Sequence, residues 1–114
     1  MSRREIGRAA LAVVIGFTVL GLTAPADSQP GVTIQLFQFR PGRLEVKTGT
    51  RLTWTNQDDI AHTVTSGTPD APDGRFDLGL AGRGASGAIG FDRAGVYPYF
   101  CSRHQAMRGE IQVN

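Results

Sequence analysis

The stretch Ala94–Val113, AGVYPYFCSRHQAMRGEIQV, contains the features that decide how this chain of 114 residues folds. The run from Val96 to Cys101 places aromatic residues and the cysteine at alternate positions, which is typical of a strand with one buried face. Pro98 lies inside this run and has no N–H, so we expect its nitrogen to point away from the neighbouring strand. Ile111 and Val113 alternate in a second run, which predicts another strand after a short loop.

The remaining sequence after residue 30 repeats this pattern in short segments separated by Gly, Pro, Asn and Asp. The change of parity between Leu36 and Phe37 predicts a β-bulge, because one extra residue reverses the buried face. The segment SGTPDAPDG, residues 66–74, is expected to be a long polar loop. About seven or eight short strands without a helical period predict an all-β fold, an antiparallel sandwich or barrel. Apolar alternation occurs at 32–36, 37–39, 44–46, 52–54, 60–64, 76–80 and 89–91.

One short segment concentrates residue types that are rare in the chain. Cys101 is the only cysteine, His104 is one of two histidines, and Met107 is one of two methionines. Their spacing allows a tight loop to direct all three side chains toward one point. The other histidine, His62, has the parity of the apolar run 60–64 and is therefore expected to face inward. Two imidazoles, a thiolate and a weakly bound thioether form the blue-copper donor set, so we predict one copper ion held by these four residues.

Each of these residues alone has a simpler explanation. A lone cysteine or methionine is usually a core residue, and an inward histidine usually forms hydrogen bonds in the core. Two other functions therefore stay open: a copper-binding or delivery protein without electron transfer, and a metal-free adhesion-type β-sandwich with Cys101 buried. No paired carboxylates or nucleophile–base arrangement indicates an enzyme. Asp58 and Asp59 are interpreted as solvated loop residues, because calcium sites need six or more oxygen ligands.

From about Val32 to Asn114 the chain resembles the cupredoxins, the plastocyanin and azurin group of blue copper proteins. The stretch AGVYPYFCSRHQAMRGEIQV has two-residue gaps on both sides of its histidine and is similar to the short loop of amicyanin and pseudoazurin relatives. The stretch GTRLTWTNQDDIAHTV, residues 49–64, is similar to the family's first-histidine region. The resemblance implies a Greek-key β-sandwich with copper near one end.

The resemblance also implies a role for individual residues. The backbone carbonyl of Ala61 would be a distant fifth group near the metal. Thr63 stands where many members have an asparagine that ties the two ligand segments together, and its hydroxyl is expected to do part of that work. Arg103 and Arg108 are expected to form a basic rim around an exposed imidazole edge. The implied ligands are His62 and His104 through imidazole, Cys101 through thiolate and Met107 as the weak axial ligand.

The ligand set and the charges around it lead to an expected function. We expect an exported type 1 copper protein that carries single electrons between a donor and an acceptor redox protein. Both partners would dock near His104, the ligand on the loop expected to reach solvent. A basic rim would favour an acidic partner and make docking sensitive to salt. A monomer is the expected oligomeric state of so small a carrier.

The N-terminus has the features of a secretory signal. Met1 to Arg8 carries three arginines, Ala9 to Leu22 is almost wholly apolar, and Ala24 to Ala26 reads A-x-A. We predict a signal peptide at 1–26, a copper-binding domain at 27–114 and a periplasmic or extracellular location. The apolar run is shorter than the roughly 20 residues that span a bilayer, so stable membrane insertion is not expected.

The charge balance of the predicted domain limits its partners. Three of the 12 Lys and Arg and one of the 10 Asp and Glu lie in the predicted signal, which leaves nine of each sign. A net charge of zero does not favour nucleic acid, which is normally bound by a basic face.

Overall fold

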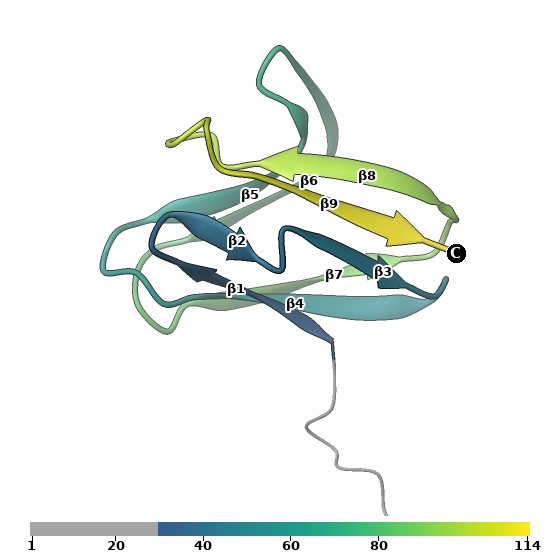
Figure 1. Cartoon of the computed structure of the whole chain (residues 1–114), viewed down its shortest axis with the longest axis horizontal. Helices are drawn as coiled ribbons and strands as arrows, with labels where there is room; N and C mark the ends of the chain where they lie inside the picture. Colours follow the sequence, from purple (N-terminus) through teal and green to yellow (C-terminus); the bar gives the residue numbers. More distant parts are fainter. Residues whose placement is uncertain (1–29) are drawn as a thin grey trace, which may run out of the picture.

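The computed structural model describes residues 30–114, which form two β-sheets packed on one another (Figure 1). The predicted signal peptide at 1–26 lies outside the described residues. Within the described chain, no helix is long and apolar enough to cross a bilayer. The strands are β1 (Gly31–Gln35), β2 (Gln38–Arg40), β3 (Arg43–Val46), β4 (Thr50–Asn56), β5 (His62–Thr68), β6 (Ala71–Leu80), β7 (Ser86–Phe91), β8 (Gly95–Phe100) and β9 (Arg108–Val113).

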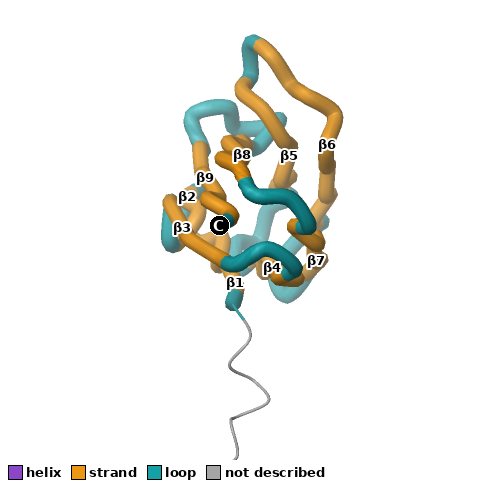
Figure 2. Tube along the Cα trace, turned by 90° about the vertical axis from the view of Figure 1, so that its right-hand side faces the viewer, coloured by secondary structure: helices purple, strands orange, loops and turns teal. Residues whose placement is uncertain are grey.

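The two sheets have a mixed topology. One has the strand order β2-β1-β4-β7 and the other β3-β9-β8-β5-β6, and Figure 2 shows the β5–β6 hairpin extending beyond the other strands. The pairs β1–β4 and β3–β9 are parallel, whereas the other pairs are antiparallel. The predicted Greek-key sandwich is therefore confirmed, with nine strands and two parallel pairs that the sequence pattern did not predict.

The predicted bulge between Leu36 and Phe37 is wrong. Gln35 pairs with Gln38, so Leu36 and Phe37 form a two-residue turn that joins β1 to β2. Both residues have positive φ, 52° and 60°. Turns of this kind usually contain Asn or Gly, which tolerate positive φ, and two bulky apolar residues therefore gave no turn signal.

The long polar loop predicted at 66–74 is also wrong. β5 continues to Thr68 and β6 begins at Ala71, and these two residues pair directly. The register shifts between Thr65 and Gly67, where Gly67 adopts a φ of 100°. β6 is an edge strand of its sheet, and polar side chains are compatible with a strand there because one of its edges faces solvent.

Pro98 fits its strand because the pairing of β8 is incomplete on one side. β9 pairs with β8 from Gly95 to Phe100, whereas β5 pairs with it only at Tyr99 and Phe100. Pro98 directly precedes Tyr99, where the pairing between β8 and β5 begins. Its missing N–H therefore removes no hydrogen bond to β5.

An aromatic cluster fills the space between the sheets. Trp54 is fully buried, and Tyr99 is 1% exposed. Their rings meet edge to face with centroids 5.5 Å apart, and Phe39 approaches Tyr99 at 4.6 Å. Burial raises the pKa of the Tyr99 hydroxyl to about 12. Gly109, opposite Tyr99 on β9, leaves the space for this ring, since a Cβ at Gly109 would overlap Tyr99 Cζ.

We predict that Gly109→Ala destabilises the protein by about 1–3 kcal/mol, because Tyr99 must leave its position or the strands must separate. Gly90→Ala is the matched control: Gly90 is also in a strand, and in the described chain no atom lies within 4 Å of its Cβ position. The free energy of unfolding in denaturant, measured on the metal-free proteins, checks this. Equal stability of the two variants would contradict the packing described for Tyr99.

Candidate metal centre

Strand pairing brings the ligand candidates to one end of the sandwich. His62 is the first residue of β5, and Cys101 directly follows β8. These strands are antiparallel neighbours, so the start of one lies beside the end of the other. Met107 directly precedes β9, which pairs with β8. The order of the strands in the sheet therefore brings together ligand segments that are far apart in sequence.

Three donor atoms surround a common point. Cys101 Sγ lies 3.7 Å from His62 Nδ1 and 3.8 Å from His104 Nδ1, and the three ligand atoms all lie within 4.8 Å of one another. Metal bonds of about 2.3 Å to sulfur and 2.0–2.1 Å to nitrogen that meet at about 120° would separate sulfur and nitrogen by about 3.7–3.8 Å. The positions of these atoms therefore fit a trigonal metal site.

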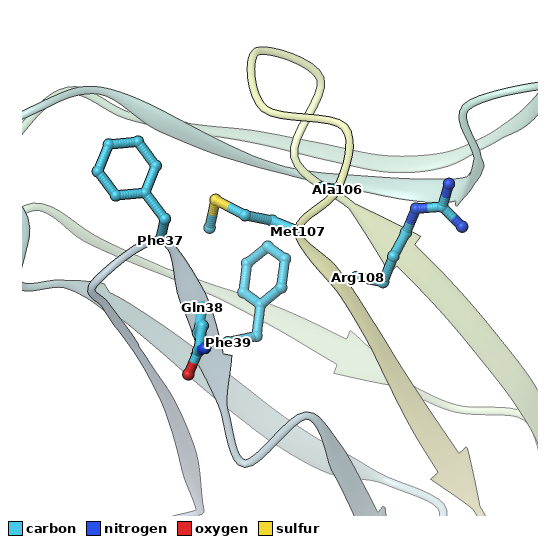
Figure 3. Close-up of a pocket in the computed structure, with 6 residues that line it drawn as sticks. All are labelled: Phe37, Gln38, Phe39, Ala106, Met107 and Arg108. Atoms are coloured by element: carbon cyan, nitrogen blue, oxygen red, sulfur yellow. The ribbon is translucent and has the colours of Figure 1, made fainter.

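The centre is shielded from solvent except at one ligand. His62 and Cys101 are fully buried and Met107 is 4% exposed, whereas His104 is half-buried. Met107 lines a surface groove, and its thioether points toward the side of that groove where Phe37 lies (Figure 3). His104 is thus the part of the centre that reaches the surface, as the sequence analysis expected. The role of the Ala61 carbonyl stays a prediction.

Short backbone hydrogen bonds close the loop that carries Cys101, His104 and Met107. The Met107 N–H donates to the His104 carbonyl at 2.9 Å, and the Cys101 N–H donates to the Met107 carbonyl at 3.2 Å. The Arg108 Nε–H donates to the Gln105 carbonyl at 2.8 Å. These hydrogen bonds tie the two ends of the loop together.

Thr63 ties the two ligand segments together, as predicted. Its hydroxyl oxygen accepts the Ser102 N–H at 2.8 Å. Its own backbone N–H donates to Cys101 Sγ at 3.4 Å. The threonine therefore crosslinks β5 to the loop and supplies a donor to the cysteine sulfur.

Asp58 is a functional residue that the sequence analysis missed, and its assignment as a solvated residue is wrong. Its side chain is only 11% exposed. Its Oδ1 accepts the Leu36 N–H at 2.8 Å, and its Oδ2 accepts the Phe37 N–H at 3.0 Å and the His62 Nε2–H at 2.8 Å. Asp59, by contrast, is exposed and paired with Arg83 at 2.8 Å, as a surface residue would be.

These contacts set the charge of Asp58 and the orientation of His62. Burial opposes ionisation of Asp58, but hydrogen bonds from the Phe37 N–H, His62 and the Leu36 N–H together lower the pKa of its carboxyl. A proton on His62 Nε2 that is shared with a carboxylate leaves Nδ1 free to bind a metal. Nδ1 is the atom that faces Cys101 Sγ. A carboxylate four residues before a histidine is the one signal that the sequence offered for this arrangement.

Asn56 holds the loop that presents Asp58. This fully buried side chain donates from Nδ2 to the carbonyls of Ile60, at 2.9 Å, and Leu80, at 3.1 Å. Its Oδ1 accepts the Asp58 N–H at 2.9 Å. The loop continues to Ala61, so Ile60 lies outside β5 and is 40% exposed. The expectation that Ile60 faces inward with His62 is therefore wrong.

Phe37 is a second residue that the sequence analysis missed at the centre. Its ring meets the His62 ring edge to face at 5.1 Å and the His104 ring at 4.8 Å, with interplanar angles of 86° and 88°. The two imidazole rings lie 5.0 Å apart. One aromatic ring thus contacts both histidines, although it lies in a turn far from either in sequence.

Comparisons with known proteins identify the same region. A model of the copper-binding proteins of the plastocyanin/azurin family matches residues 26–114. A chloroplast plastocyanin of Tetradesmus obliquus is 30% identical over 120 residues, covering 98% of this chain and 83% of the plastocyanin. Amicyanin-alpha of Methylorubrum extorquens is 27% identical over 90 residues, covering 79% of this chain and 75% of the amicyanin.

Solved structures show the same likeness. A purple cupredoxin from Nitrosopumilus maritimus aligns with a TM-score of 0.69 and 26% identity, covering 75% of this chain and all of that protein. An oxidised amicyanin mutant aligns with a TM-score of 0.67 and 28% identity, covering 79% of this chain and 86% of the amicyanin.

We predict that Asp58→Asn lowers copper affinity by about 10–100-fold and destabilises the protein by about 1–3 kcal/mol. An amide NH₂ cannot accept, so at least one of the three donors that meet the carboxylate loses its partner. Asp59→Asn is the matched control, since the neighbouring carboxylate of Asp59 pairs with the surface residue Arg83. Copper competition with a chelator and denaturant unfolding measure the two effects. Equal behaviour of both variants would show that the Asp58 contacts do not support the centre.

Proposed function

Because the chain belongs to the plastocyanin/azurin family of copper-binding proteins, we propose that it is a type 1 copper protein which carries single electrons between redox partners. The observation that carries this proposal is the cluster of two imidazole nitrogens and one cysteine sulfur within 4.8 Å of one another, with His62 and Cys101 buried and His104 half-buried. The cofactor is copper, which supplies a one-electron Cu(I)/Cu(II) couple when bound.

The chain's own residues would act by holding the donor atoms still. His62, Cys101 and His104 would supply the strong donors, with Met107 as the weak axial ligand. His62 is fixed by Asp58, and hydrogen bonds within the loop fix the segment from Cys101 to Met107. A site whose donors are held by the fold changes little between oxidation states, which keeps the barrier to electron transfer low. We therefore infer a carrier without enzymatic turnover.

Burial of the donors favours electron transfer over copper delivery. A delivery protein must pass its metal to an acceptor, which needs access to the ligands. Here His62 and Cys101 are fully buried and Met107 nearly so. Only His104 is partly exposed, which suits the passage of an electron at the surface better than the release of an ion.

We propose that donor and acceptor proteins dock on the face around His104. Three exposed apolar side chains belong to segments that surround the centre: Leu36 and Phe37 in the β1–β2 turn, and Ile60 in the loop before β5. Arg103 on the ligand loop is also exposed. An apolar contact with a basic margin would suit a partner with an apolar patch beside acidic residues, and docking would weaken as salt rises.

Export to the periplasm or the extracellular space is part of the proposal. It rests on the sequence features of residues 1–26, and the domain would begin at residue 27. We propose a monomer for the mature protein.

We predict that the Cu(II) protein has an intense visible band that disappears on reduction by ascorbate and returns on oxidation. Cys101→Ser should remove the band and the reversible redox wave, because a serine oxygen cannot replace the thiolate in a blue-copper site. Ser102→Ala, which changes the next residue and keeps the thiolate, is the control and should keep both. Visible spectra and voltammetry measure this. A pale wild-type protein, or a Cys101→Ser protein that is still blue, would refute the proposed function.

A further inference from the structure

The β1–β2 turn adopts a conformation that its residues do not favour. Leu36 and Phe37 both have φ near +55°, in the left-handed region that bulky side chains rarely occupy. Such residues persist only where their surroundings hold them, and they are concentrated at functional sites. Both oxygens of Asp58 accept the N–H groups of this turn. The carboxylate that orients His62 therefore also holds the turn.

The held turn directs one of its two side chains onto the metal ligands. Leu36 is 68% exposed and Phe37 is 47% exposed, but one face of the site is met by the Phe37 ring, which stands nearly perpendicular to both imidazole rings at centroid distances of 4.8 and 5.1 Å. Edge-to-face contact at these distances is attractive and depends on ring orientation. His62 already has a hydrogen bond that fixes its ring. The contact with Phe37 is thus of most consequence for His104, the half-buried ring on the loop.

Phe37 also borders a groove that leads toward the axial ligand. The groove has a volume of about 260 Å³ and is lined by Phe37, Gln38, Phe39, Ala106, Met107 and Arg108 (Figure 3). Its volume is sufficient for water or a small anion. Phe37 lines this groove and also contacts both imidazoles, so its ring covers the two histidines on the groove side, while Met107 itself borders the groove.

We propose that Phe37 is a positioning residue of the metal centre, whose ring holds the His104 imidazole in place and closes the groove side of the site to external ligands. The proposal rests on the proposed function, because it assumes that the cluster binds copper. A turn that served only as an apolar contact for partners would need exposed side chains, which Leu36 already supplies. It would not need a strained backbone that turns Phe37 onto two imidazoles.

The test compares Phe37→Ala with Leu36→Ala. Both variants place alanine in the same turn at the same positive φ, so a change in backbone strain affects them alike. The first measurement is the titration of each Cu(II) protein with azide, followed by the visible spectrum and electron paramagnetic resonance. The second is amide hydrogen exchange of Met107 in the metal-free proteins, because the Met107 N–H donates to the His104 carbonyl and exchanges when the loop opens.

We expect the Cu(II) form of Phe37→Ala to bind azide at least about tenfold more tightly than the wild type, because two oriented ring contacts are lost. In the metal-free state, we expect faster amide hydrogen exchange at Met107. Leu36→Ala should match the wild type in both. Phe37→Leu replaces Phe37→Ala if the latter does not fold, with the same expected directions. Azide affinity and Met107 exchange that are equal in the Phe37 and Leu36 variants would overturn the proposal.

The failure of the proposed function would look different. In that case the wild-type protein itself would lack the thiolate band with Cu(II), before any variant is compared. A blue wild type together with an unaffected Phe37 variant would leave the copper assignment intact and reject the role of Phe37 alone.

Discussion

The carboxylate of Asp58 is the contact on which the metal centre depends most. It accepts three hydrogen bonds, two from the backbone of the β1–β2 turn and one from the His62 imidazole. A buried acceptor that satisfies three donors cannot be replaced without leaving at least one of them unpaired. The turn, the orientation of His62 and the position of Phe37 therefore form one connected arrangement.

The sandwich supplies the rest of the centre through strand order. β5 and β8 are neighbours, so His62 and Cys101 meet at the same end of the sheet. Thr63 then links the two segments through the Ser102 N–H and the cysteine sulfur. Thr63 belongs to β5, and Cys101 and Ser102 directly follow β8, so we infer that the positions of the donor atoms are set by the fold and that little of the site becomes ordered on metal binding.

The candidate ligands could be selected from the sequence, and the structure brings His62, Cys101 and His104 together, whereas the residues that support them could not be selected in this way. His62, Cys101, His104 and Met107 are rare residue types at a distinctive spacing, and local sequence is enough to indicate them as candidates. The turn at Leu36 and Phe37 was misinterpreted because its conformation contradicts residue preference and is imposed by Asp58, 21 residues away from Phe37. In sequence, Asp58 differs from its neighbour Asp59 only in standing four residues before His62, and it is the folded chain that brings its carboxylate to the imidazole.

We infer that the fold sets the positions of the donor atoms before copper binds. Crystal structures of the metal-free and Cu(II) forms test it most directly. We predict that Asp58 keeps its bonds to Leu36, Phe37 and His62 in both forms, and that the two nitrogen donors and the cysteine sulfur move by less than about 0.5 Å. A metal-free structure with Asp58 turned to solvent, or with the His104 imidazole swung away from Cys101, would contradict the claim.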